Sequence, residues 1–195
     1  MLSTAGPTAA GAGTTALVVV DVLNSFFHPD CGNYYPEAAR VLEPIAKLLE
    51  TARRRDTLVV HAVERHRPGL ADFEQPKLPE HCQIGGLDSE YVDGFAPVDR
   101  AREIEVPKRR YSSFYATDLG LLLREQGVQR VVVVGVKTNV CIRATIQDGF
   151  AGGFQMVLPR EATNSNRPHL EEASIEDVSR YFGDVVDLGA AEAML

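Results

Sequence analysis

The stretch RVVVVGVKTNVCIRATIQDG, residues 130–149, decides the fold. It begins with a short run of β-branched residues, Arg130–Gly135, which is typical of a strand buried on both faces of a parallel sheet. A polar turn follows, and residues 139–149 have the apolar spacing of a helix. A buried strand that passes through a turn into a helix is the repeating unit of α/β proteins.

The same alternation continues on both sides of this stretch. Ala16–Asp21 and Thr57–Val63 are further apolar runs of strand length. Residues 37–55 between them have helical spacing, and Pro44 predicts a kink or break in that helix. The other predicted elements are strands at 103–106, 154–158 and 184–188 and helices at 117–126 and 169–181. This order predicts about six strands in one parallel sheet, with helices on both faces.

Composition and charge exclude several classes of protein. The chain has 195 residues, so we assign residues 16–195 to one domain and residues 1–15, rich in Ala, Gly and Thr, to a flexible tail. A net charge of −7 without a basic stripe argues against nucleic-acid binding. No apolar run approaches the ~18 residues of a membrane span, and the first residues lack a signal-peptide pattern. With three cysteines, an odd number, the sequence predicts a cytoplasmic protein with reduced thiols.

Three polar residues follow predicted strands, at the edge of the sheet where ligands bind in this class of fold. Cys141 lies shortly after Gly135, and Asn139 as a helix N-cap would place Cys141 in a first turn, where the dipole favours a thiolate. Asp21 ends one apolar strand and Lys108 follows another. A nucleophilic thiol needs a base for its proton and a cation beside the thiolate, and these side chains supply both.

Each of the three also has a structural interpretation. A lone cysteine is more often a small apolar residue of the core than a nucleophile. A carboxylate at a strand end often caps a loop, and a lysine there is commonly solvated. Only the combination of the three at one sheet edge points to chemistry.

Three segments of the chain resemble one family of enzymes. They are TALVVVDVLNSFF at 15–27, VPKRRYSSFYATDL at 106–119 and VVVVGVKTNVCIRATIQDGF at 131–150. In order and spacing they are similar to the isochorismatase-like cysteine hydrolase superfamily, which includes nicotinamidases and the N-carbamoylsarcosine, ureidoacrylate and biuret hydrolases. The resemblance covers nearly the whole chain, from residue 16 to residue 188.

The resemblance implies a three-layer αβα fold with a doubly wound, six-stranded parallel sheet and a catalytic triad of Asp21, Lys108 and Cys141. It also implies a cis peptide bond between Val136 and Lys137, with the backbone N–H groups of Lys137 and Cys141 as an oxyanion hole. The expected reaction is attack of the thiol on a small amide, ureido or carbamoyl compound. Hydrolysis of a thioester follows, with release of ammonia or an amine, and the triad itself needs no cofactor.

Lys137 departs from the family pattern, because relatives usually carry a small residue or threonine at this position. The oxyanion role requires only its backbone. The resemblance further implies substrate contacts at Asn24 and Phe26, and Tyr111 is a candidate wall of the pocket. Core packing is the alternative for Tyr111.

A second group of residues resembles the metal site of nicotinamidases. Glu64 and His66 follow the second strand, and His81 lies in PEHCQ further along the loop. One carboxylate and two imidazoles suit zinc, iron or manganese, so a divalent metal at these residues is one expectation. The alternative is that Glu64 pairs with an arginine while both histidines line the pocket or shape the loop.

The leading function is therefore hydrolysis of a non-peptide C–N bond in a small molecule. We also expect a homo-oligomer, a dimer or a tetramer, because the resemblance suggests it. Two other functions stay open. One is an isochorismatase-type vinyl-ether hydrolase, although relatives with that activity do not rely on a cysteine nucleophile. The other is a non-enzymatic thiol sensor or binding module on the same sheet.

Overall fold

The structure is a computed structural model and describes residues 14–195. A seven-stranded sheet has the order β3-β2-β1-β4-β5-β7, and the two-residue strand β6 pairs with the end of β4. Every paired strand runs parallel to its neighbour. The strands are β1 (Thr14–Val20), β2 (Leu58–Glu64), β3 (Glu103–Lys108), β4 (Val128–Val136), β5 (Gln155–Pro159), β6 (Thr163–Asn164) and β7 (Gly183–Val186). The parallel sheet is as predicted, and β6 is the strand that the sequence pattern does not indicate.

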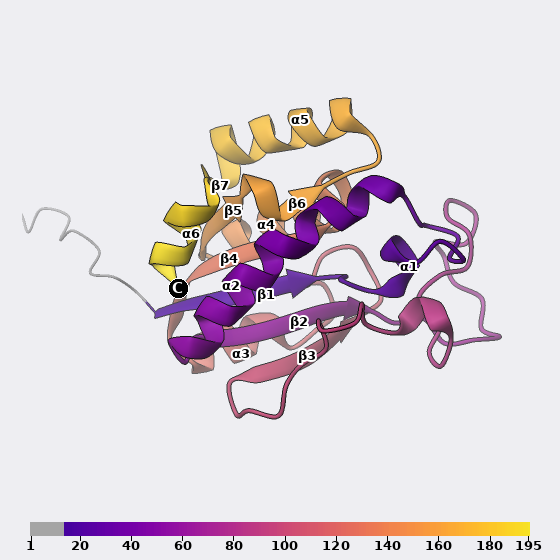
Figure 1. Ribbon diagram of the computed structural model, residues 1–195, viewed down its shortest axis with the longest axis horizontal. Coiled ribbons are helices and arrows are strands. Elements are labelled where there is room, and N and C mark those ends of the chain that lie inside the picture. The colour runs from indigo at the N-terminus through magenta and orange to yellow at the C-terminus, as the bar shows by residue number, and fades with distance from the viewer. Residues whose placement is uncertain (1–13) are drawn as a thin grey trace, which may run out of the picture.

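Helices cover both faces of this sheet, which confirms the three-layer αβα prediction. They are α1 (Asn24–Phe27), α2 (Leu42–Arg54), α3 (Leu119–Glu125), α4 (Arg143–Ala151), α5 (Pro168–Asp177) and α6 (Leu188–Met194). Short 3₁₀ turns are η1 (Pro36–Val41), η2 (Leu87–Ser89) and η4 (Arg160–Ala162), and π-helical turns are η3 (Thr138–Ile142) and η5 (Val178–Phe182). In Figure 1, α2 lies across the near face of the sheet, and α3 and α4 lie behind it.

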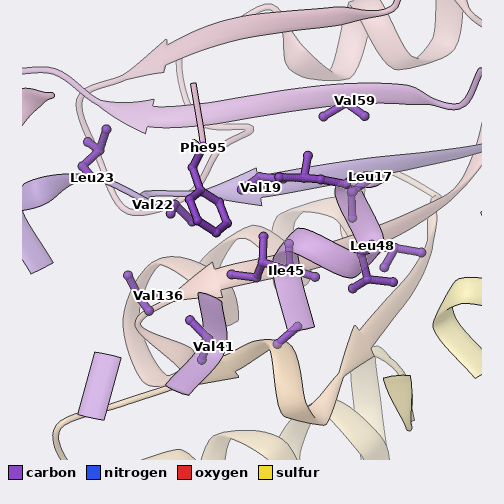
Figure 2. Packing of buried hydrophobic residues seen from close by; sticks show 14 of the residues in the cluster. Leu17, Val19, Val22, Leu23, Val41, Ile45, Leu48, Val59, Phe95 and Val136 are labelled. Atoms are coloured by element: carbon purple, nitrogen blue, oxygen red, sulfur yellow. The ribbon is translucent and has the colours of Figure 1, made fainter. Parts of the chain in front are cut away.

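The sequences of the central strands are continuous apolar runs because both faces of these strands are buried. Leu17 and Val19 of β1 point to one side and pack with Ile45 and Leu48 of α2 (Figure 2). The alternate residues of β1 point to the other side, into a second cluster that includes residues of α3 and α4. The two clusters hold the sheet between the helical layers, so the strand ends have fixed positions.

The chain reverses its direction of winding beside β1, and this places the ligand site. From β1 it proceeds outward to β2 and β3, then returns to form β4 on the other side of β1. Val20 and Gly135 pair where these two strands end. A Cβ at Gly135 would lie 2.0 Å from the Val20 carbonyl oxygen, so only glycine permits the two strand ends to be this close. In doubly wound sheets, ligands bind beyond the carboxyl ends of the strands at such a switch point.

The structure corrects several predicted boundaries. Residues 1–13 of the predicted tail lie outside the described residues, and Thr14 and Thr15 belong to β1. The break expected at Pro44 is wrong: α2 begins at Leu42, so Pro44 lies in the first turn, where no intrahelical N–H bond is lost. The predicted strand at 184–188 ends at Val186, and α6 follows it. No helix within residues 14–195 combines the length and the apolar character that crossing a bilayer requires.

A buried ion-pair network joins α2 to the outer strand β3 and makes stability depend on pH. The Glu103 carboxylate is fully buried and accepts hydrogen bonds from Arg53 at 2.6 and 3.0 Å, and its Oε1 lies 2.9 Å from His61 Nε2. Burial alone would raise the pKa of Glu103, but the contacts with Arg53 and His61 outweigh it and lower the pKa to about 2. The folded state therefore favours the ionised carboxylate.

We expect Glu103→Gln to lower the free energy of unfolding by about 3 kcal/mol at pH 7. Because the folded pKa is depressed, this stabilisation is complete above the unfolded value of 4.5 and is lost as the pH falls through about 2. Urea unfolding of both proteins at pH 7 and pH 3 measures it, and the difference should shrink by more than half at pH 3. An equal difference at the two pH values would contradict this origin.

Candidate active site

The carboxyl ends of four neighbouring strands meet at one point and carry the chemically active side chains. Asp21 follows β1, Glu64 and Lys108 end β2 and β3, and Cys141 lies in the turn after β4. Asp21 has a left-handed backbone with φ of 54°, and its N–H donates to the Ala62 carbonyl at 3.0 Å. This local turn directs the carboxylate back over the sheet edge instead of toward solvent.

Asp21, Lys108 and Cys141 form one buried cluster. Lys108 Nζ lies 2.8 Å from Asp21 Oδ2 and 3.7 Å from Cys141 Sγ. The second carboxylate oxygen of Asp21 accepts a hydrogen bond from the backbone N–H of Glu64 at 2.8 Å. The side chains of Asp21 and Lys108 are fully buried, and Cys141 is 3% exposed. An ammonium group therefore lies within reach of both the carboxylate and the thiol.

Burial dominates the electrostatics of this cluster. It raises the pKa of the Cys141 thiol well above the ordinary value, and Lys108 only partly opposes that effect. Burial also raises the pKa of Asp21 against the attraction of Lys108, which increases the proton affinity of the carboxylate. Burial opposes the charge of Lys108, but Asp21, Cys141 and Glu64 outweigh it and raise its pKa. Burial therefore opposes the thiolate that a helix start would favour.

The turn that carries Cys141 is a π-helical turn, η3, and not the first turn of a capped α-helix. The Ile142 N–H donates to the Lys137 carbonyl at 3.2 Å, and this bond spans five residues where an α-helical bond spans four. Asn139 makes no capping bond, and its Oδ1 accepts a hydrogen bond from Ser165 Oγ at 2.6 Å. The peptide bond between Val136 and Lys137 is cis. Wide turns of this kind often occur at functional sites.

A cavity of about 420 Å³ opens above the thiol. Cys141, Glu64 and His81 lie in its wall, together with Phe26 and Tyr111, which the sequence analysis placed at the substrate. Asn24 does not line it: it is the first residue of α1, and its N–H donates to the Glu90 carbonyl at 2.8 Å.

Several residues of the wall were not predicted. They are Asn33, Leu78, Asn139, Arg143 and Gln147. Val140, Ala144 and Gln147 share the cavity wall and have the i, i+4, i+7 spacing of one helical face. Because this spacing is visible in the sequence after Cys141, it could have predicted that Gln147 lines the cavity.

Glu64, His66 and His81 converge beside the thiol. Glu64 Oε1 lies 3.4 Å from His66 Nε2, and Glu64 Oε2 lies 3.2 Å from His81 Nε2. The pairing of Glu64 with an arginine, offered as the alternative, is wrong, because its ion pairs are with the two histidines. Both rings are fixed through their other nitrogen, by Asp72 Oδ2 at 3.0 Å for His66 and the Pro79 carbonyl at 2.7 Å for His81.

A fourth side chain, Glu74, joins these three and was missed by the sequence analysis. One ligand atom from each of the four residues lies within 4.8 Å of every other. Both carboxylate oxygens of Glu74, Oε1 of Glu64 and Nε2 of His66 are buried and accept or donate no hydrogen bond among the described residues. Two carboxylates and two imidazoles oriented by outer partners fit a divalent metal such as zinc, iron or manganese. Glu74 lies in a loop without periodicity, so no sequence pattern could indicate its burial.

Comparisons with known proteins identify the family of this chain. The family model described as the isochorismatase domain matches residues 15–190. Maleamate amidohydrolase of Pseudomonas putida is 32% identical over 88% of this chain and 82% of its own length. Ureidoacrylate amidohydrolase of Methylorubrum extorquens is 31% identical over 97% of this chain and 86% of its own length.

Among solved structures, the pyrazinamidase of Pyrococcus horikoshii in complex with zinc has a TM-score of 0.80 and 28% identity, and covers 89% of this chain and 99% of that one. Thus the fold is shared with a protein that holds a metal, and the similar curated proteins are amidohydrolases. The chain belongs to the isochorismatase family of hydrolases.

Proposed function

We propose that the protein is a cysteine amidohydrolase that cleaves the C–N bond of a small amide, ureido or carbamoyl compound. One observation carries the proposal: buried Lys108 Nζ lies within reach of both the Asp21 carboxylate and the thiol of Cys141, and Cys141 lines the cavity. A base with raised proton affinity, a cation and a thiol are the groups that thioester formation needs. The amidohydrolases among the relatives supply the reaction class.

In the first half-reaction, Asp21 takes the proton of Cys141 while Lys108 stabilises the thiolate. The sulfur forms a bond to the carbonyl carbon, and the C–N bond breaks as the nitrogen receives the proton. Ammonia or an amine leaves, and a thioester of Cys141 remains. The backbone N–H groups of Lys137 and Cys141 are the proposed donors to the oxyanion, which forms only during reaction.

In the second half-reaction, water replaces the amine. Asp21 accepts a proton from water, and the resulting hydroxide attacks the thioester carbon. The C–S bond breaks, the acid product is released, and the proton returns to the sulfur. The buried ion pair with Lys108 keeps the Asp21 carboxylate in place through both halves.

Glu64, His66, Glu74 and His81 would hold a divalent metal beside this centre. When bound, such an ion supplies a Lewis acid at the wall of the cavity. Glu64 and His81 both line the cavity, so these residues also orient a substrate group there. The Asp72 carboxylate accepts hydrogen bonds from Arg109 at 2.9 Å and Arg110 at 3.0 Å, which fixes the loop that carries Glu74.

The test of the proposed function is ammonia release from a panel of small amides, ureido acids and carbamoyl amino acids. Wild type and Cys141→Ala are compared in one assay, with isochorismate as an additional substrate. We expect release from at least one C–N compound by wild type and none above background by the variant. Turnover of isochorismate alone, or equal release by both proteins, would overturn the proposal.

Metal content provides a separate prediction. Protein prepared without a nickel column should contain about one divalent ion per chain, and the double variant His66→Ala/His81→Ala should contain less than about a tenth of that amount. Elemental analysis by mass spectrometry measures both, with His28→Ala as the control because His28 lies outside the cluster. Equal metal content in all three proteins would contradict the assignment of these ligands.

A further inference from the structure

Two cations line the cavity, and their charges are compensated differently. The Arg143 guanidinium donates to Asp177 Oδ2 at 2.9 Å. Lys137 also lines the cavity, and no carboxylate among residues 14–195 forms an ion pair with its side chain. Its ammonium group instead lies over two aromatic rings. Lys137 is therefore a cation in the substrate cavity without a counter-ion from the described part of the chain.

The structure holds this ammonium group in one place. Lys137 Nζ lies 5.3 Å from the ring centroid of Tyr35 and 5.6 Å from that of Phe26, both within cation–π range. Tyr35 is itself fixed, because its hydroxyl donates to Asn164 Oδ1 at 2.7 Å. Both rings are buried, so they cannot turn aside to release the lysine. A lysine that was only a solvated surface residue would not need these two aromatic contacts.

The position of Lys137 in the chain ties its side chain to the reaction centre. It is the residue between β4 and the turn of Cys141, and its backbone N–H is one of the two proposed oxyanion donors. The ammonium group thus belongs to the same residue as a backbone N–H that would contact the scissile carbonyl. Burial lowers the pKa of Lys137; Cys141 partly opposes this effect, and nearby Arg167 adds to it. A bound anion would supply that missing compensation.

We propose that Lys137 binds a carboxylate of the substrate, so that the natural substrate is an amide acid. This class has a carboxylate in addition to the scissile amide or carbamoyl group, as in a monoamide of a dicarboxylic acid or an N-carbamoyl amino acid. Lys137 is then a specificity-determining residue, and the small cavity limits the separation of the two groups to a few bonds. This proposal rests on the proposed function, because it assigns a carboxylate to the substrate of that reaction in addition to the scissile group.

Matched pairs of substrates that differ only in charge test this assignment. Succinamate and succinamide form one pair, and N-carbamoylglycine and its amide form another. We expect wild type to favour the acid of the better pair by about 10- to 100-fold in kcat/KM, the range of a charge-assisted hydrogen bond. Lys137→Met should remove this preference by raising KM for the acid more than for the neutral amide, so that the ratio of the two kcat/KM values falls to about one. Lys137→Arg should restore part of the preference.

Lys47→Met is the matched control, because Lys47 is an exposed residue of α2 that pairs only with Glu43. It should leave both members of each pair unchanged. An equal loss for the acid and the neutral amide in Lys137→Met would assign the lysine to the structure of the turn and overturn the proposal. So would an unchanged preference for the acid.

Binding separates this inference from the proposed function. In Cys141→Ala, calorimetry measures the affinity for succinamate without turnover, and adding Lys137→Met should weaken it by at least tenfold. That result would support the carboxylate site even if wild type released no ammonia, in which case only the proposed function fails. Equal affinity with and without Lys137→Met would overturn the carboxylate site while leaving the reaction class in place.

Discussion

Replacing Cys141 with serine is expected to lower kcat by at least about 10⁴-fold on any substrate that wild type turns over. The serine hydroxyl is far less acidic than the thiol, and Asp21 cannot generate a nucleophile from it at neutral pH. The change replaces sulfur by a slightly smaller oxygen and leaves the rest of the side chain in place, so folding should be retained. Ammonia release at saturating substrate measures the effect.

Cys31→Ser is the control for this variant, because Cys31 is a half-buried thiol that does not line the cavity. It should retain wild-type kcat. Near-wild-type turnover by Cys141→Ser, with the same melting temperature as wild type, would be incompatible with covalent catalysis through this residue.

Asp21→Asn is expected to lower kcat by about 10³-fold or more, since a positioned base contributes 10²- to 10⁴-fold and this carboxylate acts in both half-reactions. The substitution preserves the shape of the side chain and the left-handed backbone, which asparagine tolerates. It also removes the partner of a buried ammonium group, so the pKa of Lys108 should fall. Both effects act on the chemical step, and single-turnover kinetics measures that step.

The matched control is Asp56→Asn. Asp56 has a φ of 55°, close to that of Asp21, but its side chain is 79% exposed and pairs with Arg100 at the far end of α2. This variant should keep wild-type activity, which separates loss of the base from any effect of asparagine in a left-handed turn. If Asp21→Asn lost no more than a few-fold of kcat, another group would have to be the base.

The sheet and the position of the reactive residues were predictable because both follow from short sequence patterns, namely apolar runs and the residues at their ends. Runs such as Arg130–Gly135 are apolar without alternation, which identifies strands buried on both faces. The strand-end rule then selects the sheet edge at which Asp21, Lys108 and Cys141 meet. The isochorismatase-like family was predicted from the motifs around these residues and is confirmed by the family match.

The direction of the shift in the pKa of Cys141 could not be predicted, because it depends on three-dimensional burial. A helix start favours a thiolate, but full desolvation beside Asp21 and Glu64 reverses the sign of the pKa shift. The burial of Cys141 disfavours the thiol-sensor alternative, which needs an accessible thiolate. The contribution of Glu74 and the direction of the Lys137 side chain depend on loop and turn conformations that have no periodic signal. The homo-oligomer and the cytoplasmic location stay predictions.

The most direct measurement of the central claim is detection of the thioester on Cys141. Wild type is mixed with saturating substrate, quenched with acid during turnover and digested, and the peptide containing Cys141 is weighed by mass spectrometry. In parallel, hydroxylamine is added to intercept the acyl group as a hydroxamate. Covalent catalysis predicts a Cys141 peptide heavier by the substrate minus ammonia, together with hydroxamate, and neither product in Cys141→Ala. Ammonia release with no adduct and no hydroxamate would contradict it.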